Sequence, residues 1–339
     1  MKWNRINVGL ITLILCYLFN VLFKWMPNLY SIIYFKGIFQ VLRVVYDYTL
    51  GFLPFPSVYI IVPAFIGFFF YKRKRSKFWM LRSLIACLVW ILVVFYIVWG
   101  FNYTQPSIYG QLKLNHVGVD SSYIDMVFEK QTLKLTKLLE FGVGEAEPQD
   151  IENILRHNQE ELLREWGMPT MGRVRIRRMP GGSLLHFRTS GIYIPHVFEG
   201  HLDGGLYKKQ HPFTMAHEMA HGYGFTDESV CNFIGYLTCL RSENNWIKYS
   251  AELAYWRYLA RYYKRLHRET WSERYDKLDP MLVDDLTEIS KHINQYKDWM
   301  PKYRDVIYDQ YLKSHGVSAG IKSYDQMIHL IASYNEKTN

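Results

Sequence analysis

Two histidines and a glutamate within five residues form the part of this sequence best suited to chemistry. His217, Glu218 and His221 read H-E-x-x-H inside HPFTMAHEMAHGYGFTDESVCNFIGYLTCL, which covers residues 211–240. Histidines four apart on a helix lie about 40° apart around the axis and about 6 Å apart along it, so both rings can reach one metal ion. The glutamate after the first histidine projects beside the ion, where it can deprotonate a bound water. The spacing predicts a zinc hydrolase site with Zn²⁺ as cofactor and Glu218 as general base.

Such a site needs a third protein ligand, and two neighbouring carboxylates are candidates. Glycines directly after His221 end the first helix, and Thr226 is expected to cap a second one that returns towards the metal. Asp227 fits the metzincin spacing, whereas Glu228 with Asn232 fits the gluzincin pattern. Glu228 has the longer side chain and Asn232 lies one turn later on the same face, so Glu228 is preferred. Both acids also favour a helix N-terminus, so Asp227 stays open as the ligand.

The elements that carry this site follow an apolar N-terminal region. Apolar runs at residues 6–23, 52–71 and 81–103 each approach the ~20 residues that a helix needs to cross a bilayer. The basic loop at 72–77 predicts a cytoplasmic side between the second and third spans, which places the chain after residue 103 outside the cytoplasm. Residues 29–46 are apolar with interspersed charges, and both an interfacial helix and a re-entrant segment stay open.

Composition supports a membrane partner. The chain has 339 residues, is 49% hydrophobic and carries a net charge of +9. Lys and Arg are dispersed and often flank the apolar runs, which favours a lipid bilayer over nucleic acid as the partner. We therefore expect a membrane domain at 1–103 and a second domain at 104–339, divided into 104–240 with the metal helices and a helical lobe at 241–339.

Before the metal helix, the pattern predicts helices and a small sheet. Helical spacing covers 123–141 and 148–166, and strands are expected at 173–179, 183–187 and 191–195. In zincin proteases an edge strand next to this helix pairs with the extended substrate, and Gly191–Ile194 is the candidate here. A plain structural strand is the alternative. The histidines between the sheet and the metal helix, His196, His201 and His211, are expected in loops or at the surface.

The last third of the chain reads as helical. Helices are expected at 245–264, 280–299, 302–313 and 323–334. The first is rich in aromatic residues on one face, which favours core packing over a surface for stacking bases. Three residues near the last loop are candidates for stabilising a tetrahedral oxyanion, namely Tyr311, His315 and Tyr324.

Three parts of the chain together resemble a known family. They are the N-terminal spans, the block at 211–240 and the C-terminal YLKSHGVSAGIKSYDQMIHLIASY. They look like an uncharacterised, domain-of-unknown-function family of bacterial membrane proteins with a gluzincin-like core. In that family the residue matching Glu228 belongs to an E-x-x-x-N-F pattern, which supports Glu228 as the metal ligand. This chain departs from the pattern at Val230, where an acidic residue precedes the asparagine by two positions elsewhere.

These observations predict a mainly α membrane protein, with three transmembrane helices followed by an α+β zincin-like catalytic domain and a helical C-terminal lobe. The expected function is a zinc metallopeptidase in which His217, His221 and Glu228 hold Zn²⁺. The resemblance implies a bacterial membrane protein with a zinc protease core and implies no substrate. With the charge pattern, we expect a bacterial inner membrane, a periplasmic catalytic domain and a peptide or protein substrate in the cell envelope. A catalytically inactive zinc-binding scaffold and a zinc amidase acting on cell-wall peptides remain alternatives.

Overall fold

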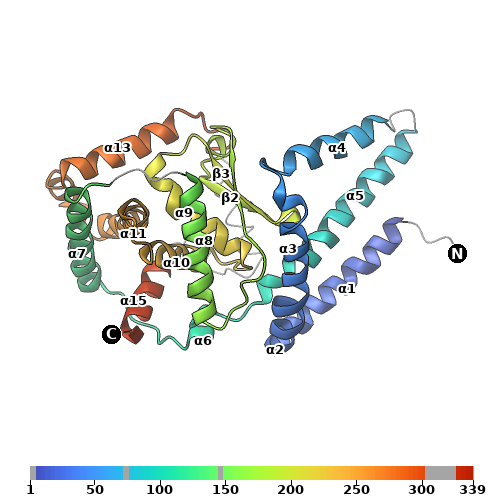
Figure 1. The fold of residues 1–339 in the computed structure, drawn as a ribbon, viewed down its shortest axis with the longest axis horizontal. Coiled ribbons are helices and arrows are strands. Elements are labelled where there is room, and N and C mark those ends of the chain that lie inside the picture. Colours follow the sequence, from blue (N-terminus) through green and yellow to red (C-terminus); the bar gives the residue numbers. More distant parts are fainter. Residues whose placement is uncertain (1–4, 72–75, 144–147, 302–325, 339) are drawn as a thin grey trace.

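The apolar N-terminal helices lie side by side with a larger mixed part of the molecule (Figure 1). The computed structural model describes residues 5–71, 76–143, 148–301 and 326–338. Among these residues, three helical stretches are long and apolar enough to cross a membrane, namely Arg5–Trp25, Pro27–Asp47 and Lys77–Val98. The expectation of three such stretches is confirmed, but the middle one is not the segment that the sequence predicts.

The segment expected as the second span, 52–71, is helical over only part of its length among the described residues. Its helix α4, Val58–Tyr71, has 14 residues. That length is about 21 Å, whereas the hydrocarbon core of a bilayer is about 30 Å thick. A 3-10 turn at Leu50–Phe52 and two prolines precede α4, and proline cannot supply the N–H groups of a continuing helix. Most of the basic loop, 72–75, lies outside the described residues, so the membrane orientation stays a prediction.

Helix α1, Arg5–Trp25, packs along α5, Lys77–Val98 (Figure 1). The two helices approach closely at Gly9, where an added Cβ would lie 2.8 Å from Val89 Cγ1. Helix α5 ends at Val98, before the expected end at 103, because a 3-10 turn at Gly100–Thr104 follows. Trp99 at this junction is only 3% exposed, so it packs against protein.

Residues 27–47 form a continuous helical segment that separates the apolar helices from the rest of the molecule (Figure 1). It consists of α2 (Pro27–Leu29), a π-helix (Tyr30–Ile38) and α3 (Phe39–Asp47). One face is buried and carries Tyr30, Tyr34, Phe35, Phe39 and Arg43. The other face exposes Ile32, Ile33, Val41 and Val45. The buried face packs against Phe23 of α1 and against Trp99, and on its other side against Phe198 of the larger part. The contact with α1 agrees with the alternative of a re-entrant segment packed against the spans, whereas neither placement predicts the contact with the larger part.

The larger part is mainly helical. Its helices are α6 (Ile108–Leu112), α7 (Ser121–Glu140), α8 (Pro148–Glu165), α9 (His211–Gly222), α10 (Glu228–Leu240), α11 (Asn245–Leu266), α12 (Trp271–Tyr275), α13 (Pro280–Asn294) and α15 (Gln326–Thr338). The predicted helices at 123–141, 148–166 and 245–264 are confirmed with ends shifted by one or two residues, while the one at 280–299 ends earlier. The helix expected at 302–313 lies outside the described residues.

The sheet has three strands in the order β1–β3–β2. Strand β1 (Ile176–Met179) pairs in parallel with β3 (Glu199–Asp203), and β2 (Gly191–Ile194) pairs antiparallel with β3. Strand β2 is therefore an edge strand, as predicted. The central strand β3 was not expected, because its sequence EGHLD is polar, although all five residues are buried.

The strand predicted at 183–187 is wrong, and the region forms turns that end in the 3-10 helix Leu185–Phe187. The carboxylate of Asp203 explains this conformation. It accepts the backbone N–H groups of Gly182, Leu184 and Leu185 at 2.9, 2.7 and 3.0 Å. These bonds bend the chain around one buried side chain and leave it unable to pair as a strand.

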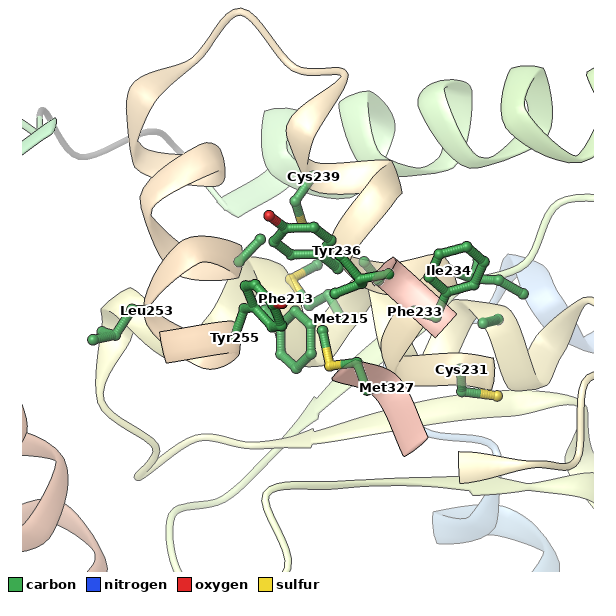
Figure 2. Close-up of a cluster of buried hydrophobic side chains, with 14 of the residues drawn as sticks. Phe213, Met215, Cys231, Phe233, Ile234, Tyr236, Cys239, Leu253, Tyr255 and Met327 are labelled. Carbon is green, nitrogen blue, oxygen red and sulfur yellow. The ribbon is translucent and has the colours of Figure 1, made fainter. Parts of the chain in front are cut away.

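A hydrophobic core packs against α9 (Figure 2). It combines Phe213 and Met215 of α9, Phe233 and Tyr236 of α10, Tyr255 of α11 and Met327 of α15. Helix α10 crosses α9 closely at Gly235, where an added Cβ would lie 3.1 Å from the backbone nitrogen of His217. The helix that carries both histidines is thus held against α10 with no room for a larger residue at this crossing.

Candidate metal centre

Helix α9 ends directly after His221, at Gly222, and the chain then turns back towards the two histidines. Gly224 has a φ of 100°, which L-residues with a side chain rarely adopt, and the chain reverses there. An added Cβ on Gly222 would lie 2.3 Å from Val174 Cγ1. On Gly224 it would lie 2.9 Å from Phe35 Cε2. Both glycines therefore allow the reversal and close packing, and the reversal leads the chain back to the histidines.

The two imidazoles stand next to each other with their outer nitrogens fixed. Their ring centroids are 4.9 Å apart and the ring planes are inclined at 82°. His217 Nδ1 lies 2.9 Å from Asn232 Oδ1, and His221 Nδ1 lies 2.8 Å from the carbonyl oxygen of Phe225. Each acceptor holds a proton on Nδ1, so Nε2 is the nitrogen that each ring turns towards Glu228. Burial lowers the pKa of His221, but Cys231 and Glu228 outweigh burial and raise that pKa well above its usual value, so its Nε2 carries a proton unless a metal ion replaces it. This orientation, with Nδ1 bonded outwards and Nε2 turned inwards, is the one that a metal-binding histidine needs.

Glu228, the first residue of α10, brings a carboxylate to both rings. Its Oε2 lies 3.2 Å from His217 Nε2 and 3.8 Å from His221 Nε2. Burial raises the pKa of Glu228, but its contacts with the two histidines outweigh burial and hold that pKa well below its usual range. The carboxylate is therefore ionised, and it faces the same point as the two Nε2 atoms.

Asp227 has a different role in the structure. Its Oδ1 accepts the backbone N–H groups of Ser229 and Val230 at 2.8 and 3.0 Å, so Asp227 is the N-cap of α10. The expectation that Thr226 caps this helix is wrong by one residue. The Asp227 carboxylate is hydrogen-bonded to its own helix, and Glu228 is the acid whose carboxylate contacts the two imidazoles.

Glu218 is buried beside the histidines, with 4% of its surface exposed. Its ligand atom and those of His217 and His221 lie within 4.8 Å of one another. The side chain packs against the sheet, since an added Cβ on Gly191 would lie 2.6 Å from Glu218 Oε1. Glu218 Oε2 has no hydrogen-bond partner among the described residues, and burial raises the pKa of this carboxyl group. An unpartnered, buried carboxylate at this position is available to accept a proton.

A cleft of about 890 Å³ opens in front of these residues. The metal cluster lies along one wall, and β2 and α11 supply much of the remainder. The end of α5 also contributes, through Phe95 and Trp99. The proposed oxyanion residues Tyr311, His315 and Tyr324 lie outside the described residues, so their role stays a prediction.

Buried polar contacts attach the apolar N-terminal region to this site. We call them the helix–sheet seam. Arg43 Nη1 donates to the carbonyl oxygen of Gly222 at 3.1 Å. Asp47 Oδ2 accepts the backbone N–H of Arg173 at 2.6 Å, and Glu199 Oε2 accepts both the N–H and the hydroxyl of Ser57 at 2.9 Å. Sequence reasoning missed the seam, although charged residues within the apolar segment at 27–47 signalled that this segment needs a partner.

Two of the three histidines expected at the surface are buried, so that expectation is wrong for them. His201 is 0% exposed, and its Nε2 lies 3.5 Å from Glu199 Oε2. His211 is 9% exposed and opens α9, and its ring donates from Nε2 to the carbonyl oxygen of Leu206 at 3.0 Å. Burial lowers the pKa of His211 to about 4. His196 is exposed as expected, and its Nε2 lies 3.1 Å from the carbonyl oxygen of Ile91 on α5.

Comparison with known proteins identifies a family and assigns no chemistry. The family described as "Protein of unknown function (DUF3810)" matches residues 34–332. No curated protein and no solved structure matches the chain. The matched range includes α3, the sheet, the candidate metal centre and α11. Since this range covers most of the 339 residues, the chain belongs to the DUF3810 family.

Proposed function

We propose that this protein is a zinc-dependent metallopeptidase attached to a membrane by its N-terminal helices. One observation carries the proposal, namely that two imidazole nitrogens and one carboxylate converge. His217 Nε2 and His221 Nε2 lie 3.2 and 3.8 Å from Oε2 of the ionised Glu228. A metal ion can replace the proton that this contact favours on His221, because neutral imidazole and carboxylate are metal ligands. Two imidazole nitrogens and one carboxylate oxygen are the ligand set of catalytic zinc.

The residues around this set fit a zinc site beyond the ligands themselves. Asn232 and the carbonyl of Phe225 hold the outer nitrogens of the two rings, as outer-shell partners do in zinc enzymes. A zinc ion held by His217, His221 and Glu228 would supply the Lewis acid that activates water and polarises a peptide carbonyl.

Glu218 performs the proton transfers in this proposal. Its carboxylate takes a proton from the attacking water, and the same group then donates that proton to the nitrogen of the leaving amine. The raised pKa of Glu218, caused by burial, makes it a stronger base than an exposed glutamate. Its contact with Gly191 and Gly200 keeps the carboxylate beside the cluster, because a side chain at either glycine would displace it.

Strand β2 supports a peptide as the substrate. It is the edge of the sheet, and Gly191, Ile192 and Tyr193 line the cleft. An extended peptide can pair with the unpaired edge of such a strand and present its backbone to the metal cluster. The 40% exposure of Ile192 leaves an apolar side chain on this edge for the substrate to contact.

The position of the cleft supports a substrate at the membrane surface. Phe95 and Trp99, at the end of α5, line the cleft directly. The loop after β2 rests on the same helix, where His196 Nε2 contacts the carbonyl of Ile91. Ile91 lies about 10 Å along the axis from the end of α5 at Val98. If α5 crosses a bilayer, the cleft opens at the interface, close to the membrane-proximal segments of other proteins.

The proposal is tested with the detergent-purified full chain and its Glu218→Gln variant. We expect wild-type protein to hold zinc and to cleave members of a peptide library, detected by mass spectrometry. Glu218→Gln should keep its zinc and lose about 10²–10⁴-fold in turnover. The matched control is Glu288→Gln, an exposed glutamate on α13 outside the cleft. Full activity of Glu218→Gln would refute the hydrolase, and zinc binding without any turnover by wild type would support the inactive scaffold.

A further inference from the structure

One face of α11 forms a long wall of the cleft. Its six lining residues recur at helical spacing, and they are Ser250, Leu253, Ala254, Arg257, Tyr258 and Arg261. This face is about 16 Å long, which is the length of about five residues of extended peptide. It changes in character along its length, because the first half is small or apolar and the second half carries two arginines. The sheet edge at Gly191 belongs to the same cleft.

Arg257 lacks the partner that a partly buried cation normally has. Within the ranges that the structure describes, its side chain forms no ion pair and no hydrogen bond. The nearest charge is another cation, since Arg261 follows it by one helical turn. Burial and, to a smaller extent, the charge of Arg261 together lower the pKa of Arg257 to about 10. Like charges four residues apart on a helix are unfavourable, so the pair does not stabilise α11.

Arg261 is held so that its charge stays near Arg257. Its Nε donates to the backbone carbonyl of Arg257 at 3.3 Å, and its guanidinium lies 4.6 Å from the centre of the Tyr258 ring. Among the described residues, the groups that shift the pKa of Arg257 are Arg261 and Tyr258, and no carboxylate is among them. Two cations maintained side by side in a cleft form a site for an anion.

This cationic part of the wall is close to the metal centre. Burial raises the pKa of Tyr258, Arg261 and Arg257 lower it, and the charge of Glu228 raises it. Tyr258 therefore lies within electrostatic reach of both the arginines and the proposed metal ligand. At the other end of the same face, Ser250 Oγ accepts the N–H of Phe213 at the start of α9. An anion bound by Arg257 would be only a few residues of peptide from the scissile bond.

We propose that Arg257, assisted by Arg261, binds a carboxylate of the substrate and so selects peptides with a negative charge close to the cleaved bond. The inference rests on the proposed peptidase function for its meaning, but its binding step does not require turnover. The planar guanidinium of Arg257 suits a carboxylate, which it can bind through two parallel hydrogen bonds. The carboxylate has two sources in a peptide, the C-terminus and an Asp or Glu side chain.

The test measures peptide binding by fluorescence polarisation to full-chain, zinc-loaded Glu218→Gln protein, which does not turn the peptide over. Three labelled pentapeptides of the same core sequence are compared: a C-terminal acid, a C-terminal amide, and an amide with one internal Asp. We expect at least one acidic peptide to bind about tenfold or more tightly than the plain amide. The acidic peptide that shows this preference identifies the source of the carboxylate.

Second-site variants locate the preference. Arg257→Gln should abolish the difference between acidic and neutral peptides and leave binding of the neutral amide unchanged, while Arg257→Lys should retain part of it. Arg261→Gln should reduce the preference less than Arg257→Gln does. The matched control is Arg265→Gln, which removes the same charge from α11 at a residue outside the cleft and should preserve the preference.

Three results would overturn the inference. One is equal affinity of the protein for acidic and neutral peptides. Another is that Arg257→Gln and Arg265→Gln lower the affinities for acidic and neutral peptides equally. The third is binding to vesicles of anionic phospholipid that depends on Arg257 while the peptides show no preference, which would assign the site to lipid. The outcome is separable from the peptidase proposal. If the protein prefers acidic peptides but wild type shows no turnover, the carboxylate subsite stands and the peptidase proposal is rejected. If wild type cleaves peptides without preferring acidic ones, the peptidase proposal stands and the subsite is rejected.

Discussion

The candidate metal centre and the helix–sheet seam both bury charged groups, but they satisfy them in opposite ways. In the seam, each buried group meets a group of the other kind, as Arg43 meets the carbonyl of Gly222 and Glu199 meets the donors of Ser57. In the candidate metal centre, the Nε2 atoms of His217 and His221 converge on the carboxylate of Glu228. The named seam contacts are made within the protein, although Arg43 Nε has no partner among the described residues, whereas the proposed metal centre would hold a cation. Buried charge serves attachment in the first region and, in our proposal, metal binding in the second.

From this difference we expect mutations in the two regions to affect different properties of the protein. Substitutions in the metal centre should remove metal and activity while the fold persists, because we propose that these residues hold an ion, and a buried ion pair adds little net stability. Substitutions in the seam should lower stability first, because each leaves a buried partner without its hydrogen bond. A result in which both regions affect both properties equally would contradict this distinction.

The largest effect is expected for Glu228→Ala. It removes a ligand, so the zinc affinity should fall by more than the 10–100-fold typical of losing an outer-shell partner, and activity should be abolished. Asp227→Ala is the matched control at the adjacent carboxylate. It should keep zinc and lose about 0.5–2 kcal/mol of stability, because Asp227 caps α10. Metal titration with thermal unfolding measures both quantities, and loss of zinc from Asp227→Ala alone would reverse the ligand assignment.

A smaller effect, on stability, is expected for Arg43→Met. Arg43 is 1% exposed, and its guanidinium lies 4.7 Å from the centre of the Tyr223 ring as well as donating to Gly222. Removing a charged donor and leaving a buried carbonyl without its hydrogen bond costs about 1.5–3 kcal/mol. The thermal midpoint of detergent-solubilised protein should fall accordingly, while the protein that remains folded binds zinc with unchanged affinity.

Arg164→Met is the control for this change. Arg164 is 55% exposed and pairs with Glu160 at 3.6 Å on α8. An exposed pair of this kind contributes about 0.3–0.5 kcal/mol, so the variant should unfold at nearly the wild-type temperature. If Arg43→Met and Arg164→Met have equal midpoints, the seam does not hold the two parts of the molecule together.

The two regions also differ in how many of their contacts can be predicted from the sequence. The metal residues lie within eleven positions and two adjacent helices, so helical geometry alone brings His217 and His221 together and returns Glu228 to them. The seam joins residues separated by 126, 142 and 179 positions. No periodicity relates partners at such distances. The charges of Arg43 and Asp47 were visible in an apolar segment, but their partners depend on how the whole chain packs.

The same limit explains the misread strands. Strand β3 was missed because its buried residues include Glu199, His201 and Asp203, which a pattern of alternating apolar residues cannot identify. Their burial depends on partners such as Ser57, more than a hundred positions earlier. The turns at 180–187 read as a strand for the related reason that Asp203 holds them from a distance. Local pattern predicted the edge strand β2, whose conformation needs no distant charge.

The smallest effect concerns His211, a buried histidine at the start of α9 that, unlike His217 and His221, has no carboxylate contact among the described residues. Burial lowers its pKa to about 4, below the usual 6.5, so the unfolded chain binds the proton more readily. Stability should therefore be unaffected above pH 6.5 and decrease as the pH falls from 6.5 towards 4, by about 1.5–2 kcal/mol between pH 7 and pH 5. In chelator, which removes any contribution from metal release, His211→Gln should lose that much less than wild type over the same interval.

The exposed His157, which is 66% exposed, provides the control, and His157→Gln should follow the wild-type pH dependence. An identical loss for wild type and His211→Gln would show that His211 titrates normally and is not a packing residue. The expected result would instead divide the histidines of a single helix. His211 is kept neutral by a site with no negative partner, while His217 and His221 face the carboxylate of Glu228. Position on α9 is common to all three, so the neighbouring carboxylate is what distinguishes a histidine suited to hold a cation from one that cannot.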